Sequence, residues 1–168
     1  MARGLREFQE YLGARLAAGD KAPTAGLLGF TAAGEHWLVD LVDAGAVVPV
    51  AALTPVPLTR PWFAGLANIR GTLHAVTDFS AFLGSAMTPQ DAQARLLLIG
   101  IRHGSNAALL VPRVLGLRQA ESFSALPASG AGEAAWARGR CADPEGQGWR
   151  RLEVAALLGD RRFLDVAA

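Results

Sequence analysis

The segment Pro61–Gly84 constrains the fold more than any other part of the chain. Residues 66–70 form a short run typical of a strand, and Gly71 allows a tight reversal because a residue without Cβ reaches positive φ at low cost. Leu73–Thr77 is the expected return strand. Asp78 then occupies the N-cap position of an apolar helical turn that ends at a glycine. We therefore expect a β-hairpin followed at once by a short capped helix.

A similar arrangement recurs in the second half of the chain, where Trp136–Gly139 matches Trp62–Gly65 and Glu153–Gly159 matches Asp78–Gly84. The separation from the first glycine to the acidic residue is nearly the same in both copies. Such self-similarity indicates two similar β units, each closed by a short helix. The alternative is a chance match between segments that are both rich in small residues.

Short strands separated by turn residues account for most of the remaining sequence. Apolar runs bounded by glycine, proline or polar residues predict strands at 26–31, 35–41, 46–53, 94–101, 107–111, 114–119, 136–142 and 148–152. Pro49 places the third of these at a sheet edge or a bulge, because proline cannot donate a ladder hydrogen bond. Residues 153–158 predict a helical turn, and 122–133 predict a long loop. Many short strands with glycine-rich turns favour a mainly β protein.

Residues 3–18 predict an amphipathic helix, because Leu5, Phe8, Leu12 and Leu16 recur every three or four positions. The apolar stripe of such a helix packs against the body of the protein or against a partner, and the first is the default.

Composition narrows the classes of function. Of 168 residues, 51% are hydrophobic and 18% are charged, so the chain is able to bury a sizeable core. A formal net charge of +1 provides no long-range attraction for nucleic acid or anionic lipid. The N-terminus has no apolar signal sequence, and no apolar run approaches the roughly 20 residues of a membrane span. We therefore expect a cytoplasmic protein.

Residues suited to catalysis or metal binding form no recognisable motif. Cys141 is the only cysteine, which excludes an internal disulfide, and we expect it to be a small half-buried strand residue. His36, His74 and His103 lack the close spacing by which one element supplies two metal ligands. The chain has no nucleophile elbow and no phosphate-binding loop. We expect no catalytic residue, no metal and no cofactor, and we interpret Asp78 as a helix cap.

Arg70 is the residue best placed to contact a partner. It lies at the tip of the expected hairpin, where a guanidinium group is able to form paired hydrogen bonds with a carboxylate. The alternative is a solvated surface arginine, since exposed ion pairs are common and weak. The residues alone therefore favour a binding module without naming its partner.

The same stretch resembles the CheW-like coupling proteins. That family has the run Gly-x-x-Asn-x-Arg-Gly, then an apolar strand, then Asp and an apolar helical turn, and the chain matches it at Gly65, Asn68, Arg70, Gly71, Val76, Asp78, Leu83 and Gly84. The resemblance covers about residues 25–160 and is most specific in the first half. The N-terminal extension and Trp62-Phe63 resemble the PilI type, which serves type IV pilus (twitching) chemosensory systems.

The resemblance implies two SH3-like five-stranded β-barrel subdomains and no enzymatic activity. It also implies an adaptor that couples methyl-accepting chemoreceptors to the regulatory domain of a CheA-type histidine kinase at membrane-associated receptor arrays. The corresponding division of the chain is 1–23 for the helix and linker, 24–90 and 91–160 for the two subdomains, and 161–168 for a C-terminal tail.

The family's receptor contact carries over to Asn68, Ile69 and Arg70. The family often has an acidic residue in the third-strand region, where this chain has Ala44 and Ala46, so a receptor contact there lacks one charge partner. Two alternatives stay open. One is an adaptor of a flagellar or other chemosensory array. The other is an enzyme or small-ligand barrel that uses the cleft between subdomains, which a deep apolar pocket with converging titratable groups would favour.

Overall fold

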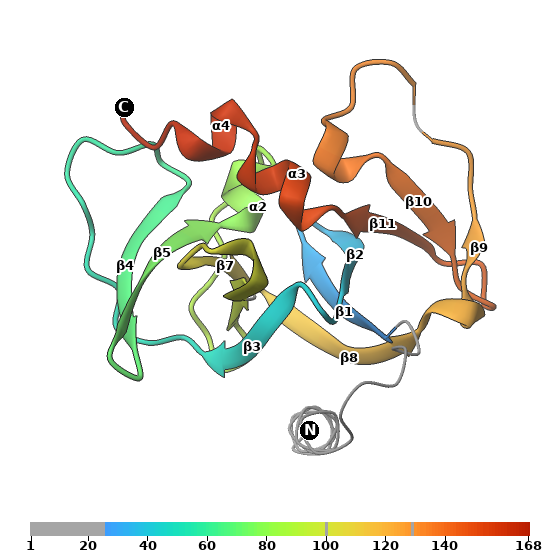
Figure 1. The fold of residues 1–168 in the computed structure, drawn as a ribbon, viewed down its shortest axis with the longest axis horizontal. Coiled ribbons are helices and arrows are strands. Elements are labelled where there is room, and N and C mark those ends of the chain that lie inside the picture. The colour runs from blue at the N-terminus through green and yellow to red at the C-terminus, as the bar shows by residue number, and fades with distance from the viewer. Residues whose placement is uncertain (1–25, 100, 129) are drawn as a thin grey trace.

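Two mixed β-sheets lie side by side in the computed structural model, with short helices between and above them (Figure 1). The structure describes residues 26–99, 101–128 and 130–168, so the helix expected over 3–18 lies outside the described residues. One sheet has the strand order β8 (Arg113–Gln119), β1 (Gly26–Ala32), β2 (Glu35–Asp40), β11 (Gly148–Leu152), β10 (Gly139–Ala142) and β9 (Ser124–Ala125). The other has the order β3 (Ala44–Pro49), β6 (Arg95–Ile99), β7 (Ala107–Val111), β5 (Thr72–Asp78) and β4 (Phe63–Ile69). The expected mainly β fold is confirmed.

Short helices and turns connect these strands. They are α2 (Phe79–Phe82), α3 (Val154–Leu158), α4 (Arg161–Leu164) and the 3-10 turns η1 (Ile101–His103), η2 (Ala120–Ser122) and η3 (Ala135–Ala137). Helix α4 was not predicted from the sequence. Its N-terminus is capped by Asp160, whose Oδ1 accepts from the N–H groups of Arg162 and Phe163, and Phe163 is buried against the core.

Two of the differences from the expected strand bounds have clear physical reasons. β3 ends at Pro49 instead of continuing to residue 53, and it is an edge strand, as the proline predicted. The strand expected over 136–142 begins only at Gly139. The N–H of Ala137 donates to the carbonyl of Ala134, so the chain makes a 3-10 turn before it enters the sheet.

The internal repeat is present in three dimensions. Trp62 precedes the hairpin β4–β5 and α2, and Trp136 precedes the hairpin β10–β11 and α3. In the first copy the N–H of Asp78 donates to the carbonyl of Trp62 at 2.8 Å. In the second copy the N–H of Glu153 donates to the carbonyl of Trp136 at 2.9 Å. The same backbone hydrogen bond therefore closes both units.

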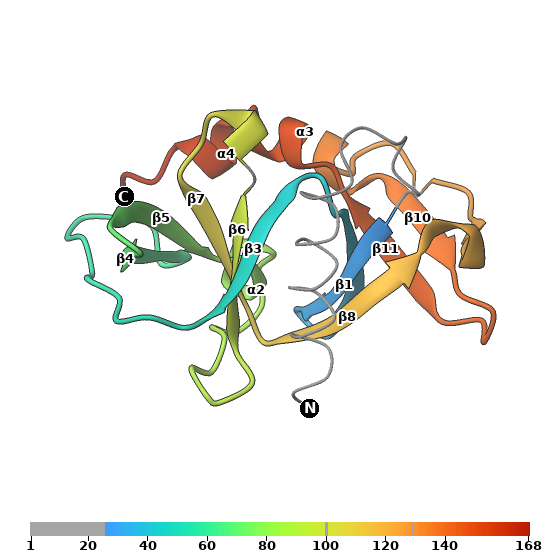
Figure 2. The same ribbon diagram turned by 60° about the horizontal axis from the view of Figure 1, so that its bottom comes forward.

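The two repeats exchange their first hairpins, which the contiguous division at 24–90 and 91–160 did not anticipate. β1 and β2 precede the first unit in sequence, but they join the sheet of β10 and β11. β6 and β7 precede the second unit, but they join the sheet of β4 and β5. The junction is a parallel pairing in both sheets, β2 with β11 and β7 with β5. β3 follows the hairpin β1–β2 and β8 follows the hairpin β6–β7, and each forms an edge of the sheet that it enters (Figure 2).

The five-stranded sheet curls back on itself through one bridge. Thr54 and Leu66 exchange two backbone hydrogen bonds of 2.8 and 2.9 Å, which tie the chain after β3 to β4. Gly65 makes this approach possible, because a Cβ at that position would lie 2.3 Å from the carbonyl oxygen of Thr54. Its φ of +124° also favours glycine.

Asp78 is a structural residue, as the sequence predicted. It is buried, and its Oδ1 accepts from the N–H of Ala81, which caps α2. The same carboxylate accepts from the hydroxyl of Thr88 at 2.8 Å and from the N–H of Thr88 at 2.7 Å. One side chain therefore caps the helix and fastens the loop that follows it.

We expect Asp78→Ala to lower the free energy of unfolding by about 2–4 kcal/mol, because the cap is lost and two buried donors of Thr88 lose their acceptor. Urea unfolding followed by tryptophan fluorescence measures the change. Glu153→Ala is the matched control, since Glu153 holds the equivalent position but makes no side-chain cap hydrogen bond. Similar losses of stability in both variants would contradict the role assigned to Asp78.

Candidate partner-binding site

Arg70 and Gly71 form the two-residue turn of the β4–β5 hairpin, with Ile69 paired to Thr72. Both turn residues have positive φ, +52° for Arg70 and +84° for Gly71. Two-residue turns with positive φ at both positions match the twist of a hairpin, and the sequence Asn-Gly is preferred at those positions. An arginine in the left-handed region costs about 1 kcal/mol relative to the ordinary regions. Backbone strain of this kind concentrates at functional sites, so the tip is a candidate site on geometric grounds.

Ile69 and Asn68, the two residues before Arg70, hold the hairpin tip in different ways. Ile69 is buried in the core of the five-stranded sheet and holds the tip in place. Asn68 is exposed, and its Oδ1 accepts from the N–H of Gly71 at 3.0 Å, which fixes the turn. Within the described residues, the guanidinium group of Arg70 makes no hydrogen bond or ion pair, and the residue is exposed. It is therefore available to a partner.

An exposed apolar face adjoins the tip, and sequence reasoning missed it. Leu73 pairs with Asn68 across the hairpin and is 55% exposed. Ala75 lies two residues further on the same face and is also exposed. His74 and Val76 are buried, so inward and outward side chains alternate along β5. This alternation is the sequence signal that assigns Leu73 to the outer face. Leu73 and Ala75 add apolar contact area next to Arg70.

The structure does not bring Ala44 and Ala46 to the hairpin tip. Both lie in β3, at the edge of the sheet opposite β4, with β6, β7 and β5 between them. Ala44 is buried and Ala46 is half-buried. The five partner-binding residues expected from the sequence therefore lie on two edge strands of the sheet.

An acidic side chain does stand directly before Ala44, and it is engaged within the fold. Asp43 Oδ1 lies 2.7 Å from His103 Nε2 and 3.6 Å from Arg102 Nε. These contacts join the turn before β3 to η1. The long sequence separation between Asp43 and His103 hid this pairing from sequence reasoning.

Cys141 and Asp143 are two further ionisable side chains that are engaged within the fold. Cys141 is a strand residue of β10, as expected, but it is buried instead of half-buried, and burial raises the pKa of its thiol. A hydrogen bond from the Trp149 indole lowers the pKa of the Asp143 carboxyl. In the described ranges, no group of three His, Cys, Asp or Glu side chains is placed to hold a metal ion.

Two open clefts have charged linings. The larger, about 530 Å³, lies beside α4 and includes Arg60 and Trp62. The smaller, about 200 Å³, includes His36 and Arg150. Neither is the deep apolar pocket with converging titratable groups that the small-ligand alternative requires. Among the described helices, none has the length and apolar character needed to cross a membrane.

Comparison with known proteins identifies the family. The family model of the CheW-like domain matches residues 26–162, a range that includes every strand of both sheets. The chain belongs to the CheW-like family. It is also 30% identical to protein PilI of Pseudomonas aeruginosa over 162 residues, which cover 91% of this chain and 89% of that protein.

A solved structure supports the CheW-like fold. The scaffolding protein TtCheW from Thermoanaerobacter tengcongensis aligns with a TM-score of 0.65 at 22% identity, over 78% of this chain and 90% of that one. At this identity the likeness shows the fold alone. CheW-like proteins are non-enzymatic scaffolds of chemosensory signalling, so the expectation that this chain is not an enzyme is confirmed by its family.

We expect Arg70→Asn to raise the free energy of unfolding by about 0.5–1 kcal/mol, because asparagine tolerates positive φ and completes an Asn-Gly turn. Urea unfolding measures the change. Ala33→Asn is a useful comparison, since Ala33 also has a φ of +52° and precedes a glycine in the β1–β2 turn. A loss of stability in Arg70→Asn would show that the arginine side chain stabilises the fold and is not kept for a partner.

Proposed function

We propose that this chain is a cytoplasmic adaptor that couples methyl-accepting chemoreceptors to a CheA-type histidine kinase. The observation that carries the proposal is the hairpin tip, where an exposed arginine without a partner among the described residues is held in a strained turn. Membership of the CheW-like family supplies the class of function. The similarity to PilI supports a type IV pilus system that controls twitching motility.

The receptor contact of the proposal is built from three side chains of the hairpin. Arg70 forms charge-assisted hydrogen bonds to a carboxylate of the receptor's helical signalling tip. Asn68 keeps the turn rigid, so less freedom is lost on binding. Leu73 covers an apolar side chain of the receptor, because it is a large exposed hydrophobic residue beside the arginine.

The kinase contact uses a different surface, because an adaptor must hold both partners at once. Signal transfer is then a matter of differential binding: the receptor state that fits the hairpin better also favours one arrangement of the kinase. These contacts recruit the protein to membrane-associated receptor arrays without inserting it into the membrane.

The alternative within the family is an adaptor of a flagellar or other chemosensory array. The hairpin motif is common to the family and does not separate the two, whereas the similarity to PilI favours the type IV pilus system. Deletion of the protein from its own organism distinguishes them. Loss of twitching with normal swimming supports the proposal, and the reverse supports the alternative.

We expect Arg70→Glu to weaken binding to a receptor-tip helical bundle at least about tenfold, because a central charge-assisted contact becomes a repulsion. Isothermal titration of the full chain measures the affinity. Arg113→Glu is the matched control, since Arg113 is an exposed arginine on β8 whose side chain, among the described residues, bonds only to the neutral side chain of Gln93.

The two variants change the net charge equally, so any difference between them is specific to position. Unchanged affinity in Arg70→Glu, or equal weakening in Arg113→Glu, would contradict the receptor contact at the hairpin tip. Cooperative thermal unfolding of both variants checks that the fold is intact.

A further inference from the structure

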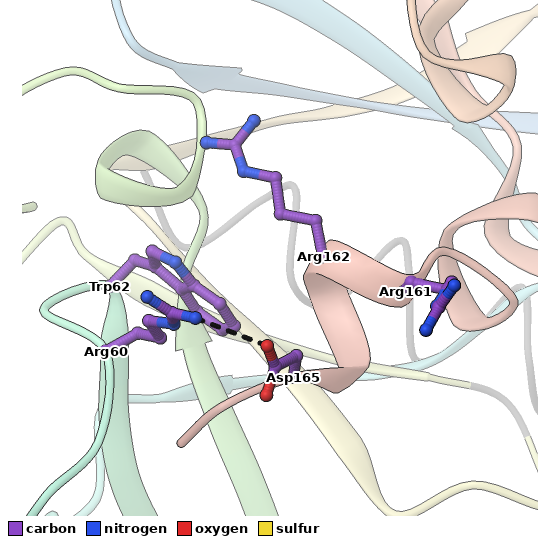
Figure 3. A pocket seen from close by; sticks show the side chains of 5 residues that line it. All are labelled: Arg60, Trp62, Arg161, Arg162 and Asp165. Atoms are coloured by element: carbon purple, nitrogen blue, oxygen red, sulfur yellow. Dashed lines mark hydrogen bonds and ion pairs between the residues drawn. The ribbon is translucent and has the colours of Figure 1, made fainter. Parts of the chain in front are cut away.

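A second surface with unneutralised charge lies at the other end of β4. Trp62 immediately precedes this strand and Arg70 follows it, so the two ends are roughly 25 Å apart at 3.3 Å per residue. The cleft at the Trp62 end is lined by Arg60, Trp62, Arg161, Arg162 and Asp165, which we call the C-terminal cleft (Figure 3). Its volume is about 530 Å³.

The C-terminal cleft carries more positive than negative charge. Arg60 is the only one of its three arginines that pairs with an acidic side chain in the described part of the chain, through Asp165 Oδ2 at 3.2 Å. Arg162 instead donates to the carbonyl of Phe82 at 2.7 Å and lies 4.8 Å above the ring of Phe82. Arg161 is exposed, and its guanidinium group has no partner within the described ranges.

Asp160, the acidic residue next to Arg161 in sequence, is engaged in other contacts. Asp160 Oδ1 accepts from the N–H of Arg162 at 2.8 Å, and Oδ2 accepts from the indole N–H of Trp136 at 2.9 Å. Both oxygens are therefore used to cap α4 and to hold it on the core. The lining of the C-terminal cleft therefore has three arginines and one aspartate, and its net charge is positive.

Exposed leucines lie beside the charged groups. Residues 58–60 pair with residues 166–168 through hydrogen bonds from Arg60 N–H to Val166 O and from Ala168 N–H to Leu58 O. This pairing sets Leu58, which is 85% exposed, next to the end of the chain that follows α4. Leu164, at the end of α4, is 59% exposed. The surface therefore offers both apolar and cationic contacts.

We propose that the C-terminal cleft binds an acidic segment of a partner protein, with carboxylates on Arg161 and Arg60 and an apolar side chain against the exposed leucines. Asp165 already shows that the cleft accepts a carboxylate, since its side chain bonds to Arg60 (Figure 3). Arginine is suited to this contact because its planar guanidinium group is able to donate two parallel hydrogen bonds to one carboxylate. The apolar rim favours a peptide over a nucleic acid, whose backbone offers no apolar side chain.

This docking surface is independent of the proposed receptor contact, because the two lie at opposite ends of β4. A partner in the cleft leaves the hairpin tip open. The protein is therefore built to hold two partners at the same time, one at each end of a single strand.

The test uses the full chain and a short fluorescein-labelled peptide of glutamate and leucine, with binding followed by fluorescence anisotropy. We expect saturable binding that Arg161→Glu weakens about tenfold, which corresponds to about 1.4 kcal/mol. Asp165→Asn should tighten binding several-fold, because it removes the carboxylate that competes for Arg60. The side chain of Asp165 is 64% exposed, so its ion pair contributes little to stability.

The controls separate a specific cleft from general charge attraction. Arg113→Glu changes the net charge equally and should bind the peptide like the unmodified chain. A glutamine and leucine peptide of the same length should bind far more weakly. Equal effects of Arg161→Glu and Arg113→Glu, weaker binding in Asp165→Asn, or tighter binding of a single-stranded oligonucleotide of the same charge would each overturn the proposal.

Discussion

The packing of α2 against both sheets is the contact on which the rest of the structure depends. Phe79 and Phe82 are fully buried, although they follow the last strand of the first repeat. Phe79 meets Trp37 edge-on, with ring centroids 5.1 Å apart, and Phe82 lies 5.5 Å from Trp136. Trp37 belongs to β2 of the other sheet, and Trp136 lies in η3, shortly before β10 of that sheet. Because protein interiors are close-packed, this aromatic contact fixes the relative position of the two sheets and of the surfaces that they carry.

Local structure was predictable from the sequence because it depends on neighbouring residues. The turn at Arg70-Gly71, the cap at Asp78 and the repeated unit of hairpin and helix all follow from short spacings. The exchange of hairpins was not predictable in the same way. The alternation of apolar and polar residues fixes which face of a strand is buried, but it does not determine which other strand pairs with that strand. β2 pairs with β11, more than a hundred residues away, and no local pattern records that choice.

The candidate site was predictable from the sequence only where it depends on neighbouring residues. Arg70 and Asn68 lie where the motif placed them, whereas Ala44 and Ala46 lie at the opposite edge of the sheet. Sequence reasoning also missed Arg161, because α4 has only four residues and its short pattern shows no helical period. The charge of the C-terminal cleft appears only when the pairing of residues 58–60 with 166–168 brings Arg60 beside Asp165. Sites made by distant segments are the ones that require the structure.

In the function that we propose, this CheW-like chain joins two partners at once through separate surfaces. The most direct test mixes the chain with the regulatory domain of the kinase and a receptor-tip helical bundle, then measures the complexes by analytical ultracentrifugation. We expect one species that contains all three components, a binary complex when either partner is absent, and no complex between receptor and kinase when the chain is left out. Two mutually exclusive binary complexes, in which each partner displaces the other, would contradict it.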